Sequence, residues 1–286
     1  MNIQSLSIVV PCGDYCYNNC RFCVSQMHHE NYGAQIISST NIPESYMQRV
    51  QWCRDEGCNS LILTGTTEPQ QNLSFIYNFL DCNSVLRTPF YNISIQTAGT
   101  NLHPTEIEKM ASRGINTFAL SLSSFDDEHN WDVIQTPKQL RTMTTSQLIK
   151  AAQNAGMNVR ICLNLTTEIK YHSIEEVFAW ANHYNIDQLT FRKIYTSEKN
   201  TNKDIWIQTH KFSDEDFKDI ITYVKHIGKP VRRLPFGAMQ YDVNGISTVI
   251  DDDCMAQRNI EEMRYAILRP NNHLYSSWNL RGSLIF

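Results

Sequence analysis

The sequence predicts an α/β fold in which parallel strands alternate with helices. Short apolar runs with strand-like composition alternate with segments of helical periodicity over the first two thirds of the chain. Prolines stand in the first turns of the expected helices, and glycines stand just past their ends. The length of 286 residues is enough for one large α/β domain or two small ones. Repeated strand–helix units imply parallel strands joined by helical crossovers.

Six strands and five helices are expected in this part of the chain. The strands are Leu6–Val10, Ser60–Leu63, Tyr91–Gln96, Thr117–Leu122, Asn158–Leu165 and Gln188–Ile194. The helices between them are Pro43–Glu56, Leu73–Cys82, Pro104–Arg113, Thr145–Ala155 and Ser173–His183. Pro43 and Pro104 lie in first turns, whereas Gly57, Gly114 and Gly156 follow helix ends.

The pattern changes from about Lys199. Residues Ser197–Asp204 are polar and predict a loop, and Ser213 is expected to cap a helix over Ser213–Ile227. We therefore divide the chain into a core over residues 1–196 and a short α+β extension over 197–286. Four short strands are expected in the extension: Val231–Leu234, Ile246–Ile250, Arg264–Leu268 and His273–Ser277.

Composition excludes several classes of protein. The net charge of −4 gives no sign of general nucleic-acid or membrane binding. No apolar run is long enough to span a membrane, and no secretory signal precedes the first strand. Nine cysteines without an export signal predict a reducing, cytoplasmic location, with cysteine used for metal or redox chemistry. Five cysteines outside the N-terminal motif are expected to be buried, inert thiols: Cys53, Cys58, Cys82, Cys162 and Cys254.

Three cysteines near the N-terminus, Cys16, Cys20 and Cys23, follow the pattern C-x3-C-x2-C. Three thiolates in one tight loop suit an iron–sulfur cluster. On a four-iron cluster, three ligands leave one iron open to bind a small molecule. Two other interpretations remain open at this point. One is a zinc knuckle that recruits His28 or His29, and the other is a closed four-thiolate site that adds Cys12.

The cysteine motif, with Phe22 just before its last member, resembles the signature of the radical S-adenosylmethionine (SAM) family. In that family the open iron of a [4Fe–4S] cluster chelates SAM, and one electron cleaves it to a 5′-deoxyadenosyl radical. The resemblance implies a partial (β/α)6 barrel, an oxygen-sensitive enzyme and an external one-electron donor such as flavodoxin or ferredoxin. The C-terminal extension would close the open side of the barrel and contribute to the substrate site.

The resemblance extends to the ends of the next strands, where barrels of parallel strands place their chemistry. Residues 64–69, Thr-Gly-Thr-Thr-Glu-Pro, are similar to the family's Gly-Glu-Pro loop, which holds the methionine end of SAM. Gly65, Thr67 and Glu68 are the implied ligands, although Thr67 replaces the usual glycine. Thr97 matches a further family position, and Ser121 is the implied ribose contact, in preference to Ser123. Phe22 would line the adenine end.

Polar residues also mark the interior of the expected barrel. Alternation places Arg160 and Asn164 on one face of the fifth strand, and Arg192 follows on the sixth. Buried polar groups need partners, so these residues predict either an anionic ligand or buried salt bridges. The tail adds arginines that can fork onto an anion or simply balance nearby acids. These are Arg232, Arg233, Arg258, Arg264, Arg269 and Arg281.

The sequence thus predicts hydrogen-atom abstraction from a substrate by a radical SAM enzyme with a single cluster. A small anionic metabolite or nucleotide is the leading substrate class, and a peptide is the second. No auxiliary cysteine cluster, leader-peptide-binding domain or cobalamin domain is expected. The long connector Ser124–Lys138 is expected to cover the site. The rival hypothesis is a non-catalytic iron–sulfur or zinc protein with Cys12 as the fourth ligand.

Overall fold

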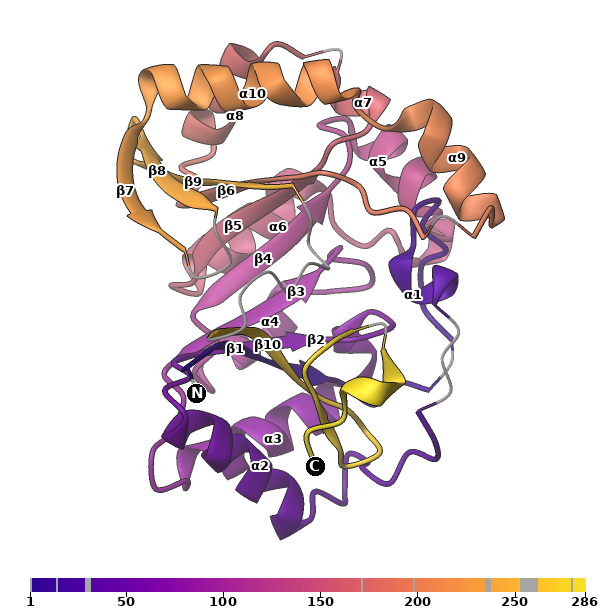
Figure 1. Cartoon of the computed structure of the whole chain (residues 1–286), viewed down its shortest axis with the longest axis vertical. Coiled ribbons are helices and arrows are strands. Elements are labelled where there is room, and N and C mark those ends of the chain that lie inside the picture. The colour runs from indigo at the N-terminus through magenta and orange to yellow at the C-terminus, as the bar shows by residue number, and fades with distance from the viewer. Residues whose placement is uncertain are drawn as a thin grey trace.

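One curved β-sheet of eleven strands runs through the described part of the molecule (Figure 1). The computed structural model describes residues 2–13, 15–28, 32–170, 172–197, 199–234, 238–252, 262–278 and 280–286. Eight neighbouring strands, from β10 to β9, run parallel. In sheet order the strands are β11 (Leu274–Tyr275), β10 (Glu262–Leu268), β1 (Asn2–Val9), β2 (Ser60–Thr64), β3 (Asn92–Thr97), β4 (Thr117–Leu122), β5 (Asn158–Asn164), β6 (Gln188–Arg192), β9 (Ile246–Asp251), β8 (Met239–Val243) and β7 (Lys229–Arg233).

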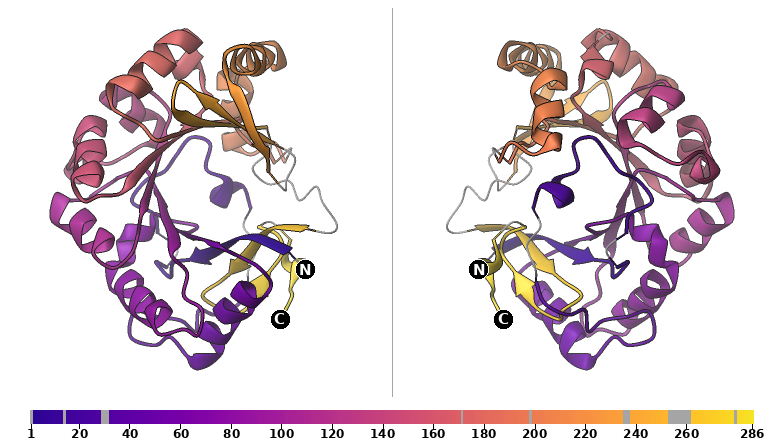
Figure 2. Two further views of the ribbon diagram at one scale, coloured as in Figure 1. Left: turned by 90° about the vertical axis from the view of Figure 1, so that its left-hand side faces the viewer. Right: turned by 90° about the vertical axis from the view of Figure 1, so that its right-hand side faces the viewer.

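Most of the helices cover the convex face of this sheet, and the concave face surrounds the centre of the molecule (Figure 2). The arrangement is that of a partial barrel, which confirms the predicted fold class. The described helices are α1 (Val24–Met27), α2 (Glu44–Asp55), α3 (Leu73–Ser84), α4 (Pro104–Ala111), α5 (Asp127–Ile134), α6 (Thr145–Asn154), α7 (Thr167–Lys170), α8 (Ile174–His183), α9 (Asn202–His210) and α10 (Asp214–Ile227).

The hydrophobic core lies between the sheet and the outer helices. Leu61 and Leu63 of β2 are fully buried on this side. Ser60, Ile62 and Thr64 alternate with them and line the concave side. Parallel strands covered by helices on both faces are apolar throughout, whereas these strands carry many polar residues on the inner face. The concave face is therefore free to form a polar site.

The six strands and five helices expected before residue 196 are all present. Their ends differ from the expected ones by one or two residues, except that β1 begins four residues earlier than expected. The helix expected after Ser213 is α10, and the Ser213 hydroxyl caps it by accepting from the N–H of Asp216 at 3.1 Å. Local signals therefore located these elements correctly, because periodicity and caps act over a few residues.

The C-terminal residues extend both edges of the same sheet. Strand β9 pairs with β6, and β8 and β7 continue that edge as antiparallel strands. Strand β10 pairs with β1 at the opposite edge, and β11 follows it. Within the described residues no pairing joins β7 to β11, so the sheet remains open there. The boundary at residue 196 remains a prediction, since strands from both sides of it share one sheet.

Two segments expected to be loops contain helices. The connector Ser124–Lys138 includes α5, whose first turn is capped by Asp126. The polar stretch Ser197–Asp204 runs into α9, where Thr201 and Asp204 form a capping box. Both helices are short and polar, so their composition resembled that of loops although the caps were present in the sequence. The predicted residues His29, Cys254 and Arg258 lie outside the described residues.

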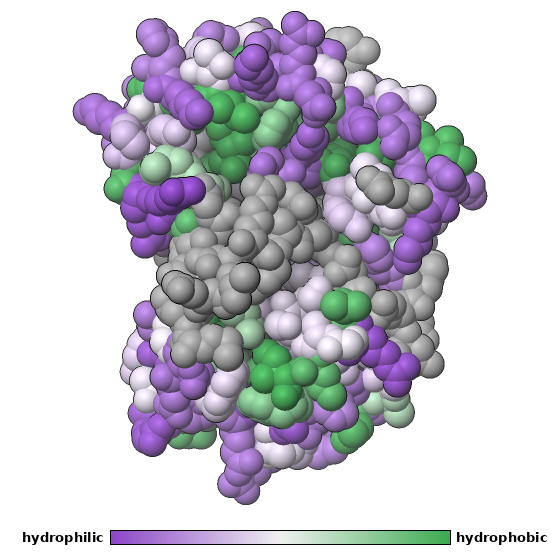
Figure 3. Space-filling model, in the orientation of Figure 1, coloured by the Kyte–Doolittle hydropathy of each residue, from purple (hydrophilic) through white to green (hydrophobic). Residues whose placement is uncertain are grey.

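The surface is hydrophilic over much of the view in Figure 3, and apolar side chains gather below its centre. Leu280, Leu284 and Phe286 of the C-terminal segment are among the exposed apolar residues of the chain. No described helix combines the length and the apolar character needed to cross a bilayer.

A tight turn after β3 depends on Gly99. Its φ of +80° lies in the left-handed region, which glycine adopts without strain. A Cβ at this position would clash with the side chain of Leu148, which is buried against the turn. Gly99 therefore lets the chain reverse direction immediately after Thr97, which places Thr97 and Thr100 at the mouth of the barrel.

We expect Gly99→Ala to lower the free energy of unfolding by about 2–5 kcal/mol. The left-handed backbone accounts for about 1–2 kcal/mol, and overpacking against Leu148 adds about 1–3 kcal/mol. Gly114→Ala is the matched control, because Gly114 also has a positive φ but has open space around the missing Cβ. Urea unfolding of both variants tests this, and equal losses would show that the contact with Leu148 is unimportant.

Candidate functional site

The loop that carries the three cysteines lies between β1 and α1. Cys23 stands at the start of α1, and its N–H donates to the carbonyl of Cys20 at 3.1 Å, which closes the turn between them. Two carbonyls at the end of α5 accept from the N–H groups of Asn19 and Arg21, both at 3.1 Å. The connector Ser124–Lys138, which was expected to cover the site, thus holds the cysteine loop through these two hydrogen bonds.

The thiols of Cys16, Cys20 and Cys23 lie close enough to influence one another. Burial raises the pKa of Cys16 to about 11 and raises that of Cys20 well above its usual range. The neighbouring Cys23 thiol contributes to both shifts. Grouped thiolates fit an iron–sulfur cluster, whose positive irons would offset this repulsion. In the described ranges, no three His, Cys, Asp or Glu side chains are arranged to hold a single metal ion.

Cys12 and His28, the other candidate ligands, face other groups. The Cys12 thiol points at the carbonyl oxygen of Glu68, 3.6 Å away. A ring nitrogen of His28 lies 3.1 Å from the Tyr195 hydroxyl. These positions support neither a closed four-thiolate site through Cys12 nor a zinc site through His28.

Glu68, in the loop after β2, is 9% exposed, and its carboxylate is held by protein donors. One oxygen accepts from the Thr97 hydroxyl at 2.6 Å, from the Gln70 amide at 2.8 Å and from the Ala98 N–H at 3.0 Å. The other oxygen accepts from the Asn18 amide at 3.3 Å. The carboxylate therefore braces three segments of chain: its own loop, the end of β3 and the cysteine loop.

Asn18 is a central residue of the site that sequence reasoning missed. It lies within the cysteine loop and is 3% exposed. While its amide nitrogen donates to Glu68, its carbonyl oxygen accepts from the hydroxyls of Thr100 and Thr136 at 2.9 and 2.8 Å. A polar residue between two cysteines carries no signal that distinguishes it from an ordinary loop residue, so only the tertiary contacts reveal it.

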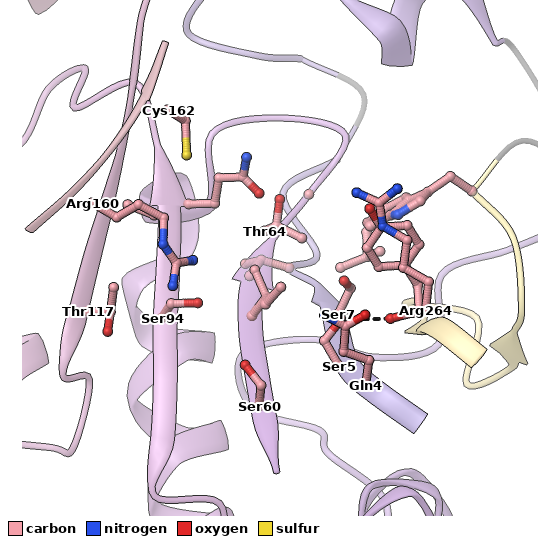
Figure 4. Close-up of a pocket in the computed structure, with 18 of the residues that line it drawn as sticks. Gln4, Ser5, Ser7, Ser60, Thr64, Ser94, Thr117, Arg160, Cys162 and Arg264 are labelled. Carbon is pink, nitrogen blue, oxygen red and sulfur yellow. Dashed lines mark hydrogen bonds between the residues drawn. The ribbon is translucent and has the colours of Figure 1, made fainter. Parts of the chain in front are cut away.

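A polar cavity of about 1630 Å³ occupies the concave side of the sheet. In Figure 4, Arg160 and Cys162 project from one wall, and Arg264 lies at the opposite wall beside Ser5. Cys162 is buried, as predicted, but it lines the cavity. Small hydroxyl side chains of β1 to β4 line much of the remaining surface: Ser5, Ser7, Ser60, Thr64, Ser94 and Thr117.

Arg160 is half-buried and places a positive charge in the lining of this cavity. Burial lowers the pKa of its guanidinium, and the nearby Arg192 lowers it further against the opposing effect of Cys162. The Arg160 Nε donates to the Gln188 side-chain oxygen at 2.6 Å. Among the described residues no carboxylate pairs with Arg160. The buried salt bridge that the sequence left open as an alternative is therefore not found at Arg160.

A buried ion pair joins the two sides of the cavity, from β9 to β10. Asp251 on β9 lies beside Arg192 in the sheet register. Its carboxylate accepts from the Arg264 guanidinium at 3.0 Å, with both side chains 7% exposed. Asp251 is the one carboxylate among the described residues that line the cavity. Five arginines line the same cavity: Arg160, Arg192, Arg232, Arg264 and Arg269.

The remaining predicted ligands occupy several environments. Gly65 lines the cavity, whereas Thr97 is buried in the Glu68 network. Ser121 is half-buried and is not among the residues that line the cavity. Asn164 donates from its amide to the hydroxyl of the fully buried Ser123 at 3.2 Å.

Phe22 and the arginines of the C-terminal tail lie in different surroundings. Phe22 packs on Trp206 of α9, with ring centroids 6.2 Å apart. Arg269 stacks on Tyr32 at 3.6 Å from the ring centroid. Arg233 and Arg281 are exposed and do not line the cavity. The tail arginines are thus divided between the cavity and the surface.

Comparisons with solved structures show the same fold in three enzymes. Streptococcus suis SuiB bound to S-adenosylmethionine has a TM-score of 0.65 and 15% identity, over 96% of this chain and 60% of SuiB. A histidine-tagged form of anSMEcpe with bound AdoMet has a TM-score of 0.61 and 14% identity, over 99% of this chain and 74% of that one. Escherichia coli HemN, a radical SAM coproporphyrinogen III oxidase, has a TM-score of 0.52 and 14% identity, over 80% of this chain and 54% of HemN.

The chain therefore spans about 60% of the length of SuiB. No curated protein sequence matches it. A family model described as the radical SAM superfamily matches residues 10–182, which is more than half of the chain and includes the cysteine loop and the Glu68 loop. Sequence motif, fold and family match agree, and the chain belongs to the radical SAM superfamily.

Proposed function

We propose that this chain is a radical SAM enzyme that acts on a small anionic substrate bound in the polar cavity. Members of the family use a [4Fe–4S] cluster and SAM. On this proposal Cys16, Cys20 and Cys23 ligate three irons and leave the fourth for SAM. When bound, the two cofactors supply a 5′-deoxyadenosyl radical that takes a hydrogen atom from the substrate. The protein's own task is to orient both molecules and exclude water.

The contacts around the cysteine loop support a division of roles at the SAM end. Because protein donors hold the Glu68 carboxylate, we assign Glu68 to bracing the loop. Contacts with the methionine end are assigned to the backbone at Gly65 and Thr67. The assignments of Phe22 to the adenine end and of Ser121 to the ribose rest on the family resemblance.

The half-buried guanidinium of Arg160, which has no carboxylate partner among the described residues, carries the substrate proposal. A cation partly withdrawn from water without an opposite charge is costly, and an anionic ligand would offset that cost. The guanidinium donates a hydrogen bond to Gln188 through Nε. Its two terminal NH2 groups can then form a forked contact with a phosphate or carboxylate. Arg192 and Arg264 also line this cavity, and Arg264 is paired with Asp251.

A peptide substrate is the competing outcome. Among the similar structures, SuiB has been captured with the precursor peptide SuiA, and anSMEcpe with the Cp18Cys peptide. At 14–15% identity these structures share the fold with this chain. The arginine-rich cavity favours a compact anion, because a peptide backbone carries no charge for Arg160 to bind.

Reductive cleavage of SAM consumes one electron, and we propose that an external donor of the flavodoxin or ferredoxin class supplies it. We place the protein in the cytoplasm. In that reducing compartment thiols persist, and the eight cysteines within the described residues are all free.

The first test concerns the cluster ligands. Reconstituted protein should hold about four irons and four sulfides per chain, as a [4Fe–4S] centre requires. Cys16→Ala, Cys20→Ala and Cys23→Ala should each lose the cluster. Cys12→Ala should keep it, because that thiol faces the Glu68 loop. Iron and sulfide analysis measures all four variants, and loss of the cluster in Cys12→Ala would restore the closed-site interpretation.

The second test separates bracing by Glu68 from direct binding of SAM. Glu68→Ala should weaken SAM binding by about 1.5–3 kcal/mol, the value of a charged hydrogen bond. If Glu68 acts through the loop, Asn18→Ala should weaken binding in the same direction. Gln71→Ala is the matched control, because the Gln71 side chain joins the same two loops through Tyr15 and Tyr17 without contacting the Glu68 carboxylate.

Calorimetry of SAM binding to the reconstituted variants gives the result. Full SAM affinity in Asn18→Ala, together with a loss in Glu68→Ala, would instead assign Glu68 to the SAM ammonium.

The third test concerns the anion site. Inorganic phosphate and pyrophosphate serve as probes, and we expect Arg160→Met to weaken their binding at least tenfold, a loss of about 1.4 kcal/mol. Arg160→Lys should recover only part of the affinity, because lysine keeps the charge and loses the fork. Arg233→Met, on the exposed surface, should bind as the parent does. Unchanged phosphate binding in Arg160→Met would contradict the anionic-substrate proposal.

The same variants identify the substrate class. Release of 5′-deoxyadenosine should increase with phosphorylated or carboxylated small molecules and should lose that increase in Arg160→Met. An increase with peptides alone would favour the competing outcome.

A further inference from the structure

Helix α9 lies over the cysteine loop and contacts it through Lys203 (Figure 1). The Lys203 ammonium donates to the carbonyl of Cys20 at 2.6 Å, and to the side-chain and backbone oxygens of Asn19 at 3.0 and 3.3 Å. The Cys20 carbonyl also accepts from the N–H of Cys23. The Cys20 carbonyl oxygen therefore accepts two hydrogen bonds, one from the turn that joins it to Cys23 and one from the charged Lys203 side chain.

The position of Lys203 is fixed by the rest of the helix. The Asp204 carboxylate accepts from the hydroxyls of Thr201 and Ser197 at 2.6 and 2.7 Å, which fastens the chain before α9. On the next turn, Trp206 packs on Phe22 of the cysteine loop. Ile207 is fully buried in the same apolar cluster. The helix that carries Lys203 is thus fixed against the loop, which brings the half-buried Lys203 side chain within reach of Cys20.

We propose that Lys203 is a positioning residue that shapes the Cys20–Cys23 turn and places a positive charge beside the cluster, so that the cluster is easier to reduce. The inference rests on the proposed ligation of the cluster by the three cysteines.

Two physical arguments support this role. One-electron reduction adds a negative charge to a centre that already carries three thiolates, and a nearby cation stabilises the reduced form more than the oxidised one. The charge and hydrogen bonding around a cluster are among the factors that set its reduction potential. Lys203 supplies the charge, and its hydrogen bond to the Cys20 carbonyl holds the turn between Cys20 and Cys23. No described acidic side chain is hydrogen-bonded or ion-paired with its ammonium.

The experiment compares Lys203→Gln, Lys203→Met and Lys203→Arg in reconstituted protein without SAM. Glutamine keeps a donor for the Cys20 carbonyl but removes the charge, so it separates the two roles. Lys218→Met, which removes a charge from α10, is the matched control. Anaerobic titration with dithionite, followed by electron paramagnetic resonance, gives the midpoint potential. Iron analysis reports cluster content independently.

We expect Lys203→Gln to retain its iron and to shift the reduction equilibrium about tenfold against the reduced form, which equals about 59 mV for one electron. Lys203→Arg and Lys218→Met should keep the parent potential. A parent-like potential in both Lys203→Gln and Lys203→Met would overturn the proposal.

A second measurement on the iron-free protein covers the case in which Lys203→Met fails to take up a cluster. Hydrogen exchange at the Cys23 amide should accelerate in Lys203→Met, because the carbonyl that accepts it is no longer held. Unchanged exchange would overturn the positioning role. If the parent protein takes up no cluster at all, the proposed function fails instead, and iron analysis identifies that case directly.

Discussion

A buried carboxylate is stable only where enough donors reach it, and Glu68 imposes this condition on the whole mouth of the barrel. Its oxygens collect donors from the cysteine loop, from its own loop and from the end of β3. If any one of these segments moved, part of the charge would lose its partners. The shape of the cysteine loop is therefore set by the sheet beneath it as well as by its own sequence. Asn18 extends this dependence to Thr100 and Thr136, which come from two further connections.

The two faces of the sheet differ in polarity, unlike those of a parallel sheet that is covered by helices on both faces. Apolar side chains are packed on its convex face, and hydroxyls and guanidiniums line its concave face. The chain carries a net charge of −4, yet the cavity lining is rich in arginine. A low-dielectric wall around such charges strengthens the field inside the cavity. Arginines therefore gather on the concave face, where we propose that the substrate binds.

The core of the fold could be predicted because its signals are local. Alternation in the strands placed Arg160 on the inner face, and helix caps located α10. Pairing of the tail strands with β1 and β6 could not be predicted, since it joins residues far apart in sequence. Asn18 and Lys203 were missed for the same reason: each acts through partners that lie at least 50 residues away in the sequence. Ser121 and Thr97 came from the family resemblance, which assigns roles without the local packing that decides them.

The pairing of β1 with β10 has a consequence for how the molecule is made. Ser5 in β1 donates to the carbonyl of Arg264, which lies 259 residues further along the chain. Contacts of such long sequence separation form late and slow the folding reaction. Until residues 262–268 have been synthesised, β1 presents an unpaired edge, which is a hazard for association with other chains. Completion of the barrel therefore waits for residues 262–268, and the free edge of β1 needs protection until they are made.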